Sequence, residues 1–199
     1  MKKIITFIII LSTLPKAAIL AQESMLPDKT YCVQFAADQN TKYGFWDLPG
    51  TKRPFQKGAS LQINIIENPI DLERRYRFKY FGNGWFKICP LTGGVLEAAK
   101  EPSNEITTQK ENENSKEQLF YLKYTKNETW IFFTYTGKQL TINSPHSNNC
   151  QNVDCCSKKS DKDTEWLLIS PETGKVFNLN RKQKNFFLQN KNQQQVFQD

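Results

Sequence analysis

The sequence contains one histidine, His146, and lacks most of the motifs that mark enzymes. It has no glycine-rich loop of the kind that binds phosphate groups and no Ser-His-Asp arrangement. The spacing H-x3-C-x4-C-C that begins at His146 fits no common zinc motif. General acid–base chemistry would depend on carboxylates, which the sequence alone does not single out. These absences predict a protein that is not an enzyme and has no metal site and no cofactor, although a hydrolase stays open.

Long hydrophobic runs are absent after the N-terminus. Lys2 and Lys3 precede an apolar run at residues 4–14, and Ala21 offers a plausible cleavage site. The run is too short to cross about 30 Å of hydrocarbon, so it is typical of a signal peptide rather than an anchor. We expect a signal peptide at 1–21 and a single domain at 22–199 with a polar C-terminal tail. We also expect no transmembrane segment in the mature chain and a secreted or extracytoplasmic location.

A dense basic stripe is missing as well. The formal net charge is +7, but Lys2, Lys3 and Lys16 belong to the predicted signal peptide, which leaves about +4 for the mature chain. The sequence has no dense stripe of lysine and arginine, interleaved with aromatic residues, of the kind that nucleic-acid-binding surfaces carry. We therefore expect no nucleic acid partner.

Five cysteines remain to be explained, and in an exported protein they favour disulfides over metal sites. Two bridges would leave one thiol over, and the pairing cannot be deduced. Cys155 and Cys156 are adjacent and are not expected to bridge each other, because a vicinal disulfide is strained. One of them is expected to join Cys150 or a distant cysteine. The five are Cys32, Cys89, Cys150, Cys155 and Cys156.

What the sequence does contain is a series of short alternating strands. Residues 118–142 read as strand, turn, strand, turn, strand, with Gly137 in the second turn. Residues 75–81 alternate three aromatic with three basic residues, and similar short runs occur throughout the chain. Residues 101–117 are polar and predict a long loop or a weak edge strand, and 143–162 predict an irregular surface loop. No helix of ten or more residues is expected, so the pattern indicates an all-β barrel or sandwich.

The strands repeat with a period of about 45 residues. Tyr76, Phe120 and Trp166 begin matching strands, and Leu96, Leu140 and Phe187 take matching places in hairpins. Three copies that pack on one another would close a barrel with threefold pseudosymmetry and few exposed edges. Four hairpin-like pieces begin near residues 31, 85, 130 and 175, so either the first or the last would lie outside such a barrel.

These repeats resemble the β-trefoil family of ricin B-type lectins. The family's Gln-x-Trp signature has its nearest match in Gln118-Leu119-Phe120, and the equivalent places read Arg74-Arg75-Tyr76 and Thr164-Glu165-Trp166. The hairpin phrase Gly-x-x-Leu-Asp-Val has looser echoes after Gly44, Gly93 and Gly137. The resemblance implies a β-trefoil fold, with another secreted β-barrel or β-sandwich as the alternative.

The resemblance also implies a function. In this family a hairpin carboxylate accepts hydrogen bonds from sugar hydroxyls, and an aromatic ring stacks on the sugar. Asp47, with Trp46 beside it, and Glu97 stand at that place in two repeats, and Thr141 stands there in the third. The alternative is that Trp46 belongs to the core and Asp47 begins a turn. No aromatic matches the stacking position in residues 60–66.

We therefore expect a secreted, non-enzymatic carbohydrate-binding protein that binds a glycan or a cell-surface glycoprotein. The second possibility is a secreted protein-binding factor on the same scaffold, such as a toxin subunit or a protease or immune modulator. In that case the basic strand face with Arg75, Arg77 and Lys79 would contact the partner protein.

Overall fold

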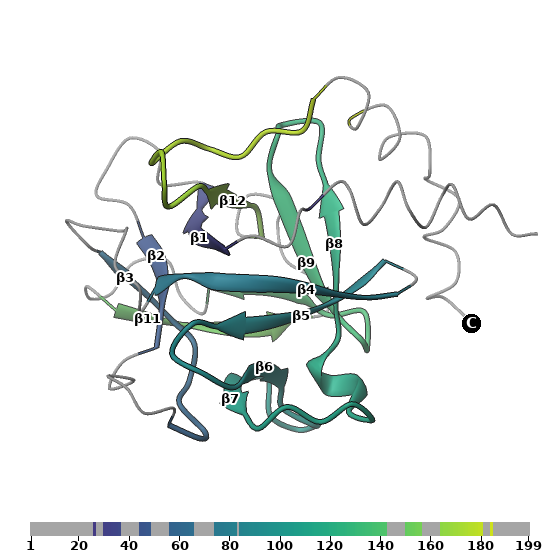
Figure 1. Cartoon of the computed structure of the whole chain (residues 1–199). Helices are drawn as coiled ribbons and strands as arrows, with labels where there is room; N and C mark the ends of the chain where they lie inside the picture. Colours follow the sequence, from purple (N-terminus) through teal and green to yellow (C-terminus); the bar gives the residue numbers. More distant parts are fainter. Residues whose placement is uncertain are drawn as a thin grey trace, which may run out of the picture.

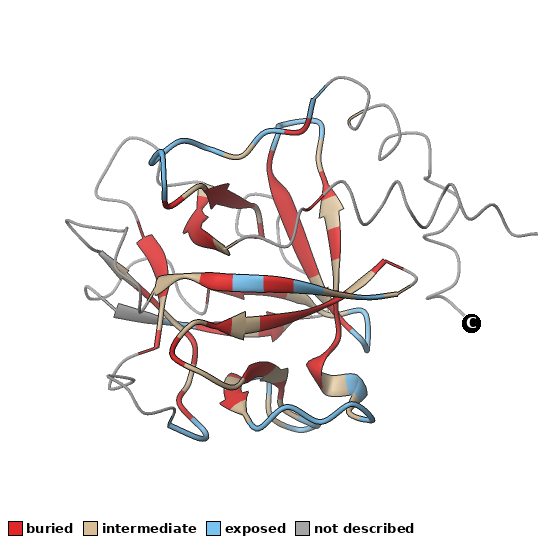
Figure 2. Cartoon of the chain, viewed as in Figure 1, coloured by how far each residue is buried: buried red, intermediate tan, exposed pale blue. Residues whose placement is uncertain are grey.

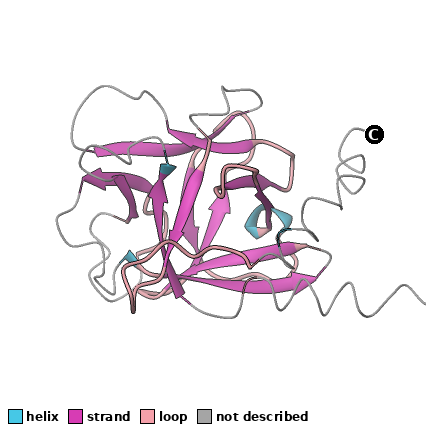
Figure 3. Ribbon diagram, turned by 90° about the horizontal axis from the view of Figure 1, so that it is seen from above, coloured by secondary structure: helices cyan, strands magenta, loops and turns pink. Residues whose placement is uncertain are grey.

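The computed structural model describes residues 26, 30–36, 44–48, 56–65, 74–82, 84–142, 150–156, 164–180 and 184. The predicted signal peptide, the polar tail, His146 and Phe187 lie outside the described residues. Strands make up most of the described chain, as the view from above shows (Figure 3). Within these ranges no helix is long and apolar enough to cross a membrane.

The described residues form twelve strands and a short 3-10 helix, η3 (Lys116–Gln118). The strands are β1 (Thr30–Phe35), β2 (Gly44–Asp47), β3 (Gln62–Ile65), β4 (Tyr76–Gly82), β5 (Trp85–Pro90), β6 (Val95–Ala98), β7 (Ile106–Gln109), β8 (Phe120–Tyr124), β9 (Trp130–Thr134), β10 (Gln139–Ile142), β11 (Cys150–Cys156) and β12 (Trp166–Ile169). Most of them match the strands that alternation predicts.

Half of the strands close a barrel. β1 pairs with β4, β4 with β5, β5 with β8, β8 with β9, β9 with β12, and β12 returns to β1, with every pair antiparallel (Figure 1). Inward and outward residues alternate along β4, where Tyr76 and Phe78 are buried and Arg77 and Lys79 are exposed (Figure 2). Ring closure gives each barrel strand two neighbours, which leaves no barrel edge open to another chain.

The remaining strands form three hairpins, β2–β3, β6–β7 and β10–β11, that cap the barrel. β11 also pairs with β3, and single bridges join β7 to Ser60 and Glu105 to Asp154. The chain therefore contains three copies of a four-strand unit: β1–β4, β5–β8 and β9–β12. This is a β-trefoil, so the predicted fold is confirmed over the sandwich and over other barrels.

Equivalent core residues mark the three copies. Tyr76, Phe120 and Trp166 begin β4, β8 and β12 and have no exposed surface, so the predicted repeat is confirmed. In the cap, the equivalent buried residues are Trp46 on β2, Leu96 on β6 and Leu140 on β10. The match of Leu96 and Leu140 is confirmed, and β2 supplies the third position through Trp46, whereas Phe187 lies outside the described residues.

The fourth hairpin-like piece lies outside the barrel. Within Lys175–Asn180, only Val176 makes a β-bridge, to Ile169, so the predicted strand there is wrong. Leu179 is nevertheless buried and Phe177 packs against the core. Its predicted partner, residues 185–189, lies outside the described residues.

Two polar stretches contain strands. In residues 101–117 the edge-strand alternative holds, because β7 pairs with β6 and buries Ile106 and Thr108. The irregular loop predicted at 143–162 is wrong for residues 150–156, which form β11. Val153 and Cys155 point inward there and are buried, because a thiol packs as a small apolar group.

The structure tests part of the cysteine prediction. The side chain of Cys150 lies outside the described residues, so a bridge from Cys155 or Cys156 to Cys150 stays a prediction. No disulfide connects two of the described cysteines, which are Cys32, Cys89, Cys155 and Cys156. The expected disulfides are therefore not observed in the part of the chain that the structure describes.

Candidate functional site

The three positions singled out by the resemblance are equivalent in the fold. Asp47 lies on β2 opposite Gln62, Glu97 on β6 opposite Thr107, and Thr141 on β10 opposite Asp154. Each directly follows the buried cap residue of its repeat. Asp47 and Glu97 are partly exposed, whereas Thr141 is buried and carries no charge. Two of the three repeats therefore present a carboxylate at this place.

In the first repeat both carboxylate oxygens of Asp47 are occupied. Asn64 Nδ2 donates a hydrogen bond to Oδ2 at 2.5 Å, and Arg74 Nε lies 3.7 Å from Oδ1. The side chains of Arg74 and Asp47 are 18% and 13% exposed, so the pair is largely shielded from solvent. This carboxylate is held by its own neighbours, and a ligand would have to share or displace them.

Trp46 cannot stack on a sugar in this structure. Its side chain has no exposed surface, and its ring lies 5.5 Å from that of Tyr76, 5.1 Å from Phe132 and 5.3 Å from Trp166. These tilted and edge-on contacts place the indole at the centre of the core, where aromatic pairs add to the stability that burial provides. The core alternative therefore holds for Trp46, and its assignment as a ligand-binding residue is corrected.

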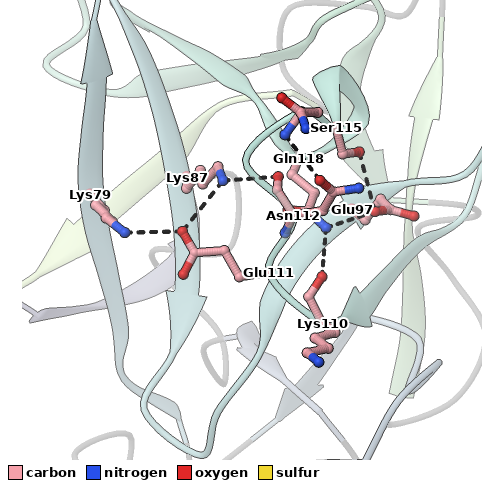
Figure 4. Close-up of polar contacts among 9 residues, drawn as sticks. Lys79, Lys87, Glu97, Lys110, Glu111, Asn112, Ser115 and Gln118 are labelled. Carbon is pink, nitrogen blue, oxygen red and sulfur yellow. Dashed lines mark hydrogen bonds and ion pairs between the residues drawn. The ribbon is translucent and has the colours of Figure 1, made fainter.

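In the second repeat the residues that the structure describes engage only one carboxylate oxygen. Glu97 Oε2 accepts a hydrogen bond from Gln118 Nε2 at 2.8 Å (Figure 4). Ser115 Oγ lies 3.4 Å from the same oxygen but donates its one proton to Glu117 Oε2 at 2.9 Å. No residue that the structure describes donates a hydrogen bond to Oε1 of Glu97. A carboxylate offers about four lone-pair positions, so this group keeps accepting capacity for a ligand hydroxyl.

Gln118, the first residue of the signature-like triplet, fixes this carboxylate. It is 1% exposed, donates a second hydrogen bond to the Lys110 carbonyl at 2.9 Å, and accepts one from the Asn112 backbone N–H at 2.9 Å. The residue therefore joins β6 to the segment before η3 and has its amide fully used. The resemblance identified Gln118 from its place in the repeat. Its hydrogen-bond partners could not be identified in that way, because residues 110–112 reach Gln118 only when the chain folds against β6.

A buried lysine braces the same segment from the other side. Lys87 has no exposed surface, and its ammonium group bonds Glu111 Oε1 at 3.3 Å and the Asn112 carbonyl at 3.1 Å (Figure 4). Lys79 bonds the same Glu111 oxygen at 3.0 Å. The hydrogen bond from Lys79, together with that from Lys87, holds the pKa of Glu111 below its usual value. Sequence reasoning missed this brace, because Lys87 reads as an ordinary outward-facing strand residue.

A pocket of about 200 Å³ lies beside this site. One wall is the chain that leaves β6 at Ala98, Ala99 and Lys100, and Glu117 on η3 adds to it. The other wall is the β9–β10 turn, from Thr134 to Lys138. Ser115 Oγ lies within hydrogen-bonding distance of both Glu97 and Glu117, which connects the Glu97 site to the pocket. The pocket therefore lies between the second and third repeats.

Charges in the pocket wall are paired. Lys100 Nζ lies 3.4 Å from Glu117 Oε1, and Lys138 bonds both Glu101 and Asn104. The backbone N–H of Glu117 and then the Ser115 hydroxyl bond the Glu117 carboxylate and keep its pKa below the usual value. The hydrogen bond to Glu101 raises the pKa of Lys138. Each lysine of the wall is therefore paired with a glutamate, and the two pairs together carry no net formal charge.

Metal binding has no support in the described part of the chain. No three His, Cys, Asp or Glu side chains come together there in a way that could hold a metal ion. Asp154, Cys155 and Cys156 lie along one strand, and successive residues of a strand point to opposite faces.

No protein-family model and no curated protein matches this sequence. Solved structures do match the fold. ThreeFoil, a designed threefold-symmetric protein, matches with a TM-score of 0.60 and 14% identity over 71% of this chain and 98% of its own. A chain of the cytolethal distending toxin of Actinobacillus actinomycetemcomitans matches with a TM-score of 0.59 and 14% identity, over 77% and 98%.

The ricin B-like lectin of Macrolepiota procera, solved in complex with lactose, matches with a TM-score of 0.54 and 11% identity, over 71% of this chain and 94% of its own. At such low identity these likenesses show the fold alone. The protein is a β-trefoil that resembles ricin B-type lectins.

Proposed function

We propose that the protein is a secreted, non-enzymatic carbohydrate-binding protein that uses the second repeat, around Glu97, to bind glycans at a cell surface. The observation that carries this proposal is the Glu97 carboxylate, which Gln118 holds through Oε2 while Oε1 accepts no hydrogen bond from the residues that the structure describes. A fixed carboxylate acceptor suits sugar hydroxyls, because charge-assisted hydrogen bonds are short and directional.

The neighbouring repeats support Glu97 as the main site. Asp47 has both oxygens engaged by Asn64 and Arg74, and Thr141 is buried. The shared fold adds support of a general kind, because the Macrolepiota procera lectin uses the same architecture and was solved with lactose bound.

A glycan array with the mature protein tests this function. The Glu97→Gln variant keeps an oxygen that can accept from Gln118 but loses the charge, so we expect about a tenfold loss of glycan binding. The matched variant Asp47→Asn should keep most of the signal. Full binding by an Asp47→Ala/Glu97→Ala double variant would refute the site, and a blank array from a demonstrably folded sample would refute the function.

A protein-binding role is the second candidate, and the outer face of β4 favours it. Arg77, Lys79 and Phe81 alternate along one face of that strand, and Phe81 is 46% exposed. Exposed aromatic and arginine side chains are the residues that most often dominate protein interfaces. Capture of a cell-surface protein that survives excess free sugar and is lost in Phe81→Ala would support this role over glycan binding.

A further inference from the structure

We propose that the pocket between the second and third repeats is a subsite for one neutral sugar residue and that Tyr135 supplies its aromatic wall. This inference rests on the proposed function, and it names an aromatic that the hairpin pattern of the first repeat lacks. Tyr135 comes from the β9–β10 turn, so the site would be assembled from two repeats rather than from one hairpin.

The size of the pocket limits its occupant. Its volume is about 200 Å³, whereas pockets for drug-sized ligands begin at about 300 Å³. A single sugar ring at the end of a glycan fits this limit better than an extended chain does. The Glu97 carboxylate, connected to Glu117 through Ser115, lies where the next residue of such a glycan could reach it.

Tyr135 is placed to contact a ligand. It is 39% exposed, and its ring lies 5.4 Å from that of Trp85, which packs against it from β5. The tight turn behind it depends on Gly137 at φ 78° and on a hydrogen bond from the Gly137 N–H to the Thr134 carbonyl at 2.9 Å. The ring is therefore held on a short, well-bonded turn, which lowers the entropic cost of binding.

A lysine side chain lies over the Tyr135 ring. The Lys116 ammonium lies 5.0 Å from the centre of its ring. An exposed cation–π pair of this kind is weak, so a sugar that stacks on the same face can displace the lysine. Removal of Lys116 should therefore leave binding unchanged or strengthen it by up to about fivefold.

The paired charges of the wall set the class of sugar. Lys100 with Glu117, and Lys138 with Glu101, give donors and acceptors for hydroxyl groups but no net charge. An anionic sugar would have to compete with Glu117 or Glu101 for a lysine, whereas a neutral sugar can bond to the pairs as they stand. We therefore expect neutral glycans to bind in preference to sialylated ones.

The equivalent place between the first and second repeats lacks this wall. The β5–β6 turn carries Leu91 where the β9–β10 turn carries Tyr135, and Gly94 where it carries Lys138. The aromatic and one of the two lysines are therefore missing from that junction. We expect one neutral-sugar subsite of this type per chain at these two junctions.

The test is a glycan array that carries neutral and sialylated glycans, read with the wild type and three variants. Tyr135→Ala should lose at least about fivefold of the neutral-glycan signal. Val176→Ala is the control, because Val176 is an exposed apolar residue that does not line the pocket, and it should bind as the wild type does. Lys116→Ala should bind at least as well as the wild type.

The outcomes separate this inference from the function on which it rests. A wild-type protein that binds no glycan overturns both. Neutral-glycan binding that Tyr135→Ala leaves intact, or that Val176→Ala weakens equally, overturns the subsite but leaves the function. A signal confined to sialylated glycans overturns the neutral-sugar assignment.

Discussion

Replacing Gln118 should measure how much the hydrogen bonds around Glu97 contribute to the stability of the protein. Its side chain makes one hydrogen bond to a carboxylate and two to backbone groups, and it is almost completely buried. A hydrogen bond to a charged group contributes about 1.5–3 kcal/mol and a neutral one about 0.5–1.5 kcal/mol. Gln118→Ala should therefore lower the free energy of unfolding by about 3–5 kcal/mol and the melting temperature by roughly 10 °C.

The isosteric variant Gln118→Glu adds a pH signature. At pH 7 it places a second carboxylate against Glu97, which removes the donor and adds repulsion, so the pKa of the introduced carboxyl is raised. The destabilisation is then complete above that raised pKa and is relieved as the pH falls through it, because one shared proton restores a donor. The difference in unfolding free energy from the wild type should narrow between pH 7 and pH 5 for Gln118→Glu and stay constant for Gln118→Ala.

Urea denaturation of the three proteins at several pH values measures these differences, provided that the slopes with urea agree. A Gln118→Ala protein as stable as the wild type would show that the hydrogen bonds around Glu97 contribute nothing. A pH-independent deficit in Gln118→Glu would show that the two carboxyls do not lie together.

Four further substitutions test other parts of the structure. Glu111→Gln removes the anion beside the buried Lys87 and should lower the free energy of unfolding by about 1–2 kcal/mol. Lys87→Met should change that free energy by under about 1 kcal/mol. Equal losses of the two variants in urea denaturation would contradict the contact between Lys87 and Glu111. Because the folded-state pKa of Glu111 is lowered, the contribution of this carboxylate to stability is present above its unfolded-state pKa and is lost as the pH falls through its folded-state pKa. The free energy of unfolding of Glu111→Gln should therefore fall less steeply with acid than that of the wild type. Trp46→Ala should cost about 3–5 kcal/mol in unfolding free energy, and a smaller loss would contradict its central packing. Gly44→Ala should cost about 1–3 kcal/mol because its methyl would overlap Ile63 Cγ2, and an unchanged melting temperature would contradict that contact.

Alternation and spacing predicted most of the fold. The aromatic residues Tyr76, Phe120 and Trp166 repeat at nearly equal intervals of 44 and 46 residues, because each begins the last strand of its unit and fills an equivalent place in the core. The strand β11 was missed because only Val153 and Cys155 on its inner face are apolar, and three cysteines so close together favoured a stapled loop. Polar cap strands carry a weak signal, since only one side of each faces the core.

The site was predictable only in part. Position in the repeat was enough to single out Asp47 and Glu97, but their difference depends on which side chains reach them from elsewhere, Arg74 and Asn64 in one case and Gln118 in the other. Position in the repeat did not show whether the Trp46 side chain lies at the surface or in the core. Tyr135 could not be identified as a pocket residue from sequence spacing, because it lies beside Ala98 and Lys100 only where the second and third repeats pack together.

The most direct test of the central claim is a heteronuclear NMR titration of the mature protein with the neutral glycan that gives the strongest array signal. A glycan bound at the second repeat should shift the amide signals of residues 97–101, 115–118 and 134–138 and leave those of β2 and β3 in place. Shifts confined to β2 and β3, or to the outer face of β4, would contradict the account.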